Sequence, residues 1–163
     1  MKKTYKILCL VFVLLLAIPI GIYAQLFYLG RWEYKVETFE TVQEDFQKVA
    51  DFCYDYLQEK DQTSYQWIAV SDGAHLFYNG QEIPIDPSLQ NSLQRVAQAF
   101  PNKDAKLDVI RCYGKVVSFD THNGLYSVVY SPQGKSAIKN LPELEDAKLK
   151  KINQTWFHVS SAY

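Results

Sequence analysis

Residues 65–85 have the sequence YQWIAVSDGAHLFYNGQEIPI, and this stretch decides the fold of the region around it. Two runs rich in β-branched and aromatic residues flank a turn at residues 71–73, which is typical of paired strands. Asn79-Gly80 then joins the second run to a third, because type I′ hairpin turns need positive φ at both positions. The stretch therefore predicts antiparallel strands, and Pro84 predicts that the last one is an edge strand or ends early.

A helix is predicted on each side of this stretch. Between Thr38 and Leu57, apolar residues recur every three or four positions, which is the spacing of one helix face. Asp86-Pro87 supplies a capping side chain and a proline at the first helical position, and Pro101 ends the helix that follows. Further strands are predicted over 106–113, 115–120, 125–130, 135–139 and 154–160. Strands in runs, with helices apart from them, indicate an α+β fold in which two main helices pack on a small antiparallel sheet.

The N-terminal region carries a separate signal. Residues 7–29 contain no charged side chain, and as a helix they extend about 34 Å, against about 30 Å of bilayer hydrocarbon. Three lysines precede the run, which predicts a cytoplasmic N-terminus and residues 32–163 outside. The predicted fold is thus an N-terminal transmembrane helix followed by the α+β domain. Residues 1–31 form the anchor or signal segment, and residues 32–163 form one extracytoplasmic domain.

The same N-terminal residues also fit a cleaved secretory signal. A basic start, an apolar run and Ile22-Tyr23-Ala24 before Gln25 are the parts of such a signal. Cleavage after Ala24 makes the domain a secreted protein, whereas retention makes it a single-pass membrane protein with a signal anchor. Both alternatives export the domain.

The charge balance argues against nucleic-acid binding. Three of the 17 basic residues lie before the apolar run and no acidic residue precedes Glu33, so residues 30–163 hold 14 basic and 18 acidic side chains, a net charge of −4. Phosphate recognition needs clustered Lys and Arg, which an acidic domain does not supply. The predicted partners are therefore the membrane, through residues 7–29, and a protein or peptide, without nucleic acid.

The sequence contains no P-loop, HExxH, GxGxxG or GxSxG motif. We therefore predict no catalytic residue, no metal ligand and no cofactor. His75 and His122 lie beside turns with an aspartate nearby, so they are weak binding candidates and the basis of an alternative function, a small exported hydrolase. Asp51, Asp55 and Glu59, spaced four apart along the first predicted helix, indicate its solvated face.

Cys53 and Cys112 are the cysteines of the predicted domain. Cys53 lies on the apolar face of the first helix and Cys112 lies in a predicted strand, so packing of helix on sheet points one toward the other. A disulfide between them, worth about 2–4 kcal/mol where the geometry fits, is one alternative. Two buried, inert thiols are the other, and two distant cysteines without local partners do not indicate a zinc site.

Aromatic side chains are the remaining binding candidates, at 15% of the chain. Successive strand residues point to opposite faces, so the adjacent pairs Phe77–Tyr78 and Trp156–Phe157 cannot both point inward. We name Tyr78 and Trp156 as candidate binding residues on this ground, although covering both sheet faces would bury them. The function that the sequence favours is a membrane-anchored extracytoplasmic binding or accessory domain.

Overall fold

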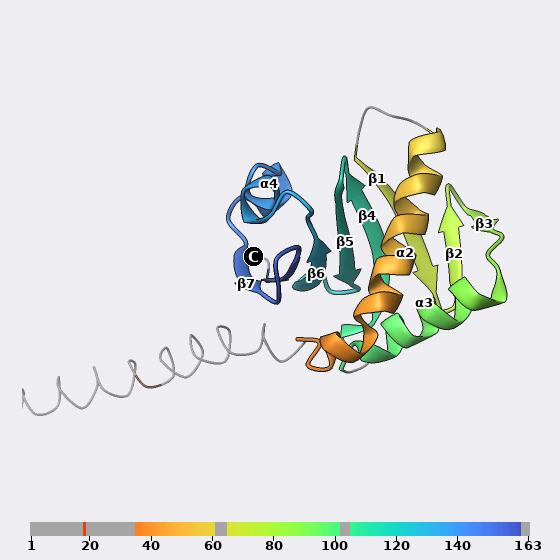
Figure 1. Cartoon of the computed structure of the whole chain (residues 1–163), viewed down its shortest axis with the longest axis horizontal. Coiled ribbons are helices and arrows are strands. Elements are labelled where there is room, and N and C mark those ends of the chain that lie inside the picture. The colour runs from red at the N-terminus through yellow and green to blue at the C-terminus, as the bar shows by residue number, and fades with distance from the viewer. Residues whose placement is uncertain (1–17, 19–34, 61–64, 102–104, 161–163) are drawn as a thin grey trace, which may run out of the picture. The chain divides into compact units, whose positions relative to one another are not determined.

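The computed structural model describes residue 18 and residues 35–60, 65–101 and 105–160 (Figure 1). The chain divides into two compact units, Met1–Glu33 and Tyr34–Tyr163. Over the described part of the second unit, an eight-stranded antiparallel sheet combines with three α-helices into an α+β fold.

The sheet has the strand order β3-β2-β1-β4-β5-β6-β8-β7, and all neighbours pair antiparallel. The strands are β1 Gln66–Ser71, β2 His75–Tyr78, β3 Gln81–Ile83, β4 Leu107–Tyr113, β5 Val116–Thr121, β6 Tyr126–Tyr130, β7 Lys148–Lys151 and β8 Trp156–Ser160. Strands adjacent in sequence form two meanders, β1 to β3 and β4 to β6. The β1–β4 pair joins the two meanders into one sheet, and β8 lies between β6 and β7.

The β2–β3 hairpin confirms the prediction from its turn residues. Asn79 and Gly80 have φ angles of +50° and +77°, which are left-handed at both positions, as a type I′ turn requires. β3 ends at Ile83, one residue before Pro84, and forms an edge of the sheet. A proline has no N–H to donate to a further strand, so its position agrees with this edge.

Two helices, α2 Phe39–Lys60 and α3 Pro87–Ala99, pack against each other and cover the same face of the sheet (Figure 1). α3 begins as predicted, because the Asp86 side chain accepts a hydrogen bond from the Leu89 N–H at 2.9 Å and Pro87 occupies the first turn. The two helices are joined by Arg95 of α3, whose guanidinium donates to both carboxylate oxygens of Asp45 at 2.7 and 2.5 Å. The hydrogen bond from Arg95 holds the pKa of Asp45 below its ordinary value.

Phe46 lies at the centre of the core between α2 and the sheet. Its ring centroid is 4.9 Å from that of Phe119 on β5, 5.8 Å from Trp156 on β8 and 6.2 Å from Phe100 after α3. All four side chains are buried. Rings at these separations and tilted angles are favourable beyond their buried area, so one helical residue ties together both helices and two distant strands.

The opposite face of the sheet is covered over only part of its width. α4 Lys135–Lys139 and the 3-10 helix η2 Pro142–Leu144 place Ile138 and Leu144 in a second apolar cluster with Val116, Val129, Phe157 and Val159. These partners belong to β5, β6 and β8. The prediction of a strand over 135–139 is wrong, because a single short turn of helix is enough to seat Ile138 in this cluster. The two main helices α2 and α3 share the other face.

The predicted fold must be corrected at its N-terminal transmembrane helix. Among the described residues, no helix is long and apolar enough to cross a membrane. The 22 residues of α2 suffice in length, but α2 is amphipathic and exposes Asp51, Asp55 and Glu59 to solvent. The prediction of a single-pass membrane protein with a signal anchor depended on that helix and is corrected with it. Apart from Ile18, residues 7–29 lie outside the described residues, so membrane contact, export and cleavage after Ala24 stay predictions.

We expect replacement of Phe46 by alanine to lower the free energy of unfolding by about 3–5 kcal/mol, because it removes a buried ring and leaves a cavity among three others. Urea denaturation followed by far-UV circular dichroism measures this loss. Trp67→Ala, at an exposed strand position, is the matched control and should change stability by less than about 1 kcal/mol. Equal effects of the two substitutions would contradict the central place of Phe46.

Candidate functional site

A group of large side chains lies on the sheet face opposite α2 and α3, beyond the reach of α4. Trp67 pairs with Arg111 across β1 and β4, and Ala69 lies between Phe77 of β2 and Val109 of β4. Residues paired directly across antiparallel strands point to the same face. We call the surface formed by Tyr65, Trp67, Phe77, Val109 and Arg111 the open sheet face.

Two aromatic side chains of the open sheet face are largely in solvent. Trp67 is 47% exposed and Tyr65 is 45% exposed, and within residues 35–160 as described these are the exposed large hydrophobic residues. Phe77 and Val109 are half-buried. Tyr65 packs its ring against that of Tyr113 at 5.1 Å. The surface is therefore largely apolar and aromatic, and all its members except Tyr65, which directly precedes β1, lie on strands.

A buried polar network fixes Arg111 on the β4 side of this face. Its Nη1 donates to Asp120 Oδ2 at 2.6 Å, while Ser118 Oγ donates to Asp120 Oδ1 at 2.6 Å and Ser127 Oγ donates to the same oxygen. Burial raises the pKa of the Asp120 carboxyl, although Arg111 and the two serines oppose the rise. Burial also lowers the pKa of Arg111, but Asp120, Tyr65 and Tyr113 more than compensate and raise it overall.

The arrangement presents a cation in a fixed orientation. About a third of the Arg111 side chain remains exposed, and a guanidinium has five N–H donors. Several donors therefore remain for an acceptor that approaches from solvent. Next to Trp67 and Tyr65, Arg111 completes the set of residue types that dominate binding energy at protein interfaces.

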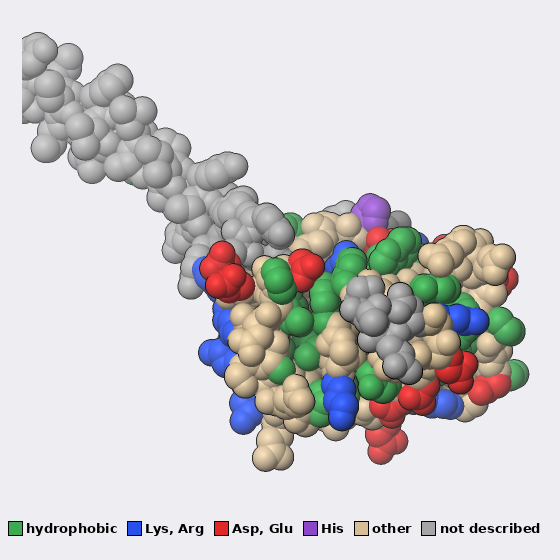
Figure 2. Space-filling view, turned by 90° about the horizontal axis from the view of Figure 1, so that it is seen from above, with side chains coloured by type: hydrophobic (Ala, Val, Ile, Leu, Met, Phe, Trp, Pro, Cys, Tyr) green, Lys and Arg blue, Asp and Glu red, His purple; other side chains and the backbone are tan. Residues whose placement is uncertain are grey.

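Both edges of the sheet are poorly suited to pairing with another strand. In Figure 2, lysine and arginine side chains gather along the left border of the surface. The edge strand β7 exposes Lys148, Lys150 and Lys151. Lysine-rich edges and very short edge strands such as β3 resist strand addition. A partner therefore finds the face of the sheet more accessible than its edges.

The two aromatic residues named from sequence occupy the helix-covered side. Trp156 is 1% exposed and lies in the core, and half-buried Tyr78 packs its ring on Tyr56 of α2 at 5.9 Å. The open sheet face was missed because alternation shows that Tyr65 and Trp67 share a face but does not show which face the helices cover. Once α2 and α3 are placed, the same alternation identifies these residues.

His75 and His122 are each paired with a different carboxylate. His75 Nδ1 lies 2.7 Å from Glu82 Oε1, and His122 Nδ1 lies 3.5 Å from Asp108 Oδ1. Both imidazoles are widely exposed. Neither is aligned with a serine or cysteine nucleophile by any contact of the described residues, so this geometry gives the hydrolase alternative no support.

Cys53 and Cys112 are buried with free thiols. Burial raises the pKa of Cys53 far above its ordinary value, and proximity to Cys112 raises it further. Burial raises the pKa of Cys112 to about 12. Thiols in this state are protonated and poor nucleophiles at neutral pH.

A third histidine, His158, belongs to a buried cluster that also contains Val36, near the start of the second unit, and Tyr126 of β6. The Val36 N–H donates to Tyr126 Oη at 3.0 Å, and Tyr126 Oη lies 2.6 Å from His158 Nδ1. Burial, with smaller contributions from Lys35 and Lys150, lowers the pKa of His158 to about 4. The imidazole is therefore neutral at pH 7 and shares a hydrogen bond with the Tyr126 hydroxyl through Nδ1.

Comparison of the chain with protein-family models, curated proteins and solved structures gives no match. The functional conclusion accordingly depends on the chain's own geometry.

His158 makes stability depend on pH in a known direction. Its folded-state pKa lies below the ordinary value of 6.5, so as pH falls from about 6.5 to about 4 the unfolded chain binds a proton that the folded chain does not. We expect a loss of about 1–3 kcal/mol over this window, measured by urea denaturation at successive pH values. His158→Gln keeps an acceptor for Tyr126 without titrating, and its stability should fall less over the window. Identical pH profiles would show that His158 is not the cause.

Proposed function

We propose that residues 35–160 form a non-catalytic binding module that holds a partner protein on its open sheet face. The observation that carries the proposal is the exposure of Trp67 and Tyr65 beside Arg111, on a face that α4 and η2 cover only over β5, β6 and β8. Folding gains nothing from the exposed part of these rings.

The energetics of the exposed rings favour a macromolecular partner. Covering the exposed half of a tryptophan side chain is worth about 2–3 kcal/mol. Strand β1 carries Trp67, and Tyr65 directly precedes this strand with its ring packed on Tyr113, so little conformational entropy is lost on binding. Arg111 is already oriented by Asp120, which lowers the cost of ordering its side chain.

The chemistry of the face also defines its partner. The surface to be covered is apolar around Trp67 and Phe77, with a fixed cation at Arg111 and the exposed carboxylate of Glu82 beside Phe77, its partner across β2 and β3. A complementary partner therefore offers apolar side chains together with a carboxylate or carbonyl oxygen that reaches the remaining guanidinium N–H groups. We expect the partner to be a protein rather than a polyanion, because a single arginine does not make the basic cluster that phosphate recognition needs.

Site-specific photo-crosslinking tests this proposal with the full chain in the cells that produce it. With p-benzoylphenylalanine in place of Trp67, we expect a covalent adduct of one discrete mass with a protein. The control carries the same group at Asn91, an exposed position on α3, where we expect no such adduct. Absence of an adduct at Trp67, or equal adducts at both positions, would contradict the proposal.

Once the crosslinked protein is identified, its affinity can be measured by calorimetry. We expect Trp67→Ala to weaken binding by about 2 kcal/mol or more, which is roughly a 30-fold rise in Kd. Stability should be nearly unchanged, because the ring is exposed. A substitution that alters stability but not affinity would show that Trp67 serves the fold instead.

A further inference from the structure

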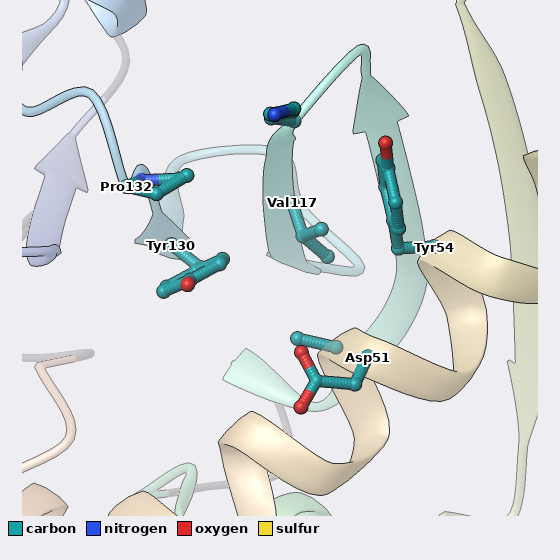
Figure 3. A pocket seen from close by; sticks show the side chains of 7 residues that line it. Asp51, Tyr54, Val117, Tyr130 and Pro132 are labelled. Carbon is teal, nitrogen blue, oxygen red and sulfur yellow. The ribbon is translucent and has the colours of Figure 1, made fainter.

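A hollow of about 170 Å³ lies on the helix-covered side of the sheet, away from the open sheet face. Its lining comes from α2, from the turn between β4 and β5, from β5 itself, and from the end of β6 and the residues after it (Figure 3). The residues that define it are Asp51, Tyr54, Lys115, Val117, Tyr130 and Pro132. It opens to solvent, so a ligand can enter without any rearrangement of the chain.

The walls of this hollow are aromatic and apolar. Tyr54 and Tyr130 stand on opposite sides of it, with Val117 between them (Figure 3). Tyr130 is held in place because its ring packs on buried Trp156 at 5.0 Å. The face of a tyrosine ring attracts an ammonium group through its ring electrons. These walls therefore suit a small ligand that carries a positively charged group.

Opposite charges line the hollow without neutralising each other. Asp51 accepts a hydrogen bond from Gln47 at 2.8 Å, and within the described residues it forms no ion pair with Lys115. Lys115 follows the turn at Gly114, and no described carboxylate lies within ion-pair distance of its ammonium group. Asp51 and Lys115 thus bring one carboxylate side chain and one ammonium side chain to the lining of the same hollow, and neither is in an ion pair within the described residues.

We propose that this hollow binds a small α-amino acid as its zwitterion, with the ligand ammonium at Asp51 and the ligand carboxylate at Lys115. The volume agrees with this class of ligand, since an engineered cavity of about 150 Å³ holds benzene. A ligand with a single charge leaves Asp51 or Lys115 unpaired, and a larger ligand extends into solvent. The site is separate from the partner surface, so either can fail without the other.

Titration of the purified full chain by amide NMR tests the proposal with three ligands of similar size. L-alanine carries both charges, propionate lacks the ammonium group and ethylamine lacks the carboxylate. We expect alanine to give saturable shifts confined to amides around Asp51, Lys115 and Val117, in about the millimolar range. Propionate and ethylamine should bind at least about tenfold more weakly, because each loses one charge-assisted contact.

Matched variants separate the proposed contacts from general charge effects. Asp51→Asn and Lys115→Met should each weaken alanine binding at least about tenfold. Asp55→Asn, one helical turn along the exposed side of α2, and Lys151→Met on β7 should leave it unchanged. All four positions are exposed, so the folded spectrum should persist. Unsaturable or dispersed shifts, equal binding of propionate, or an unchanged Asp51→Asn variant would each overturn the proposal.

Discussion

The packing of Phe46 against Phe119 and Trp156 is the interaction on which the rest of the structure depends. It seats α2 on the sheet, and the Asp45–Arg95 pair then holds α3 beside it on the same face. With both long helices on one side, only α4 and η2 among the described residues cover the other side. They are too short to cover eight strands, so the surface around Trp67 stays in solvent.

The same placement of α2 creates the hollow beside it. Asp51 and Tyr54 follow Phe46 along the helix and stand at its flank, while Val117 and Tyr130 come from β5 and β6. The molecule therefore offers two separate surfaces with different chemistry. One is broad, aromatic and suited to a protein, and the other is small, lined by both charge signs and suited to a small ligand.

Local features of the fold could be predicted from sequence, whereas the distribution of helices between the two faces could not. Asn79-Gly80, Pro84 and the Asp86-Pro87 cap each act within a few residues, so their effects are readable. Alternation along β1 and the residue before it places Tyr65 and Trp67 on one face, but whether that face is covered depends on distant α4. The hollow could not be predicted from the sequence either, because it brings together Asp51 and Lys115, which are 64 positions apart in the sequence. The apolar character of residues 7–29 was the basis for predicting a transmembrane helix, and the described residues contain no such helix.

The central claim is that the face around Trp67 is open in the protein alone and covered by a partner where the protein works. Hydroxyl-radical footprinting with mass spectrometry measures this directly, with buried Trp156 as the internal reference. The account predicts strong oxidation of Trp67 and little of Trp156 in the purified chain, and protection of Trp67 in the producing cell. Protection of Trp67 in the purified chain, or equal oxidation of Trp67 in both settings, would contradict it.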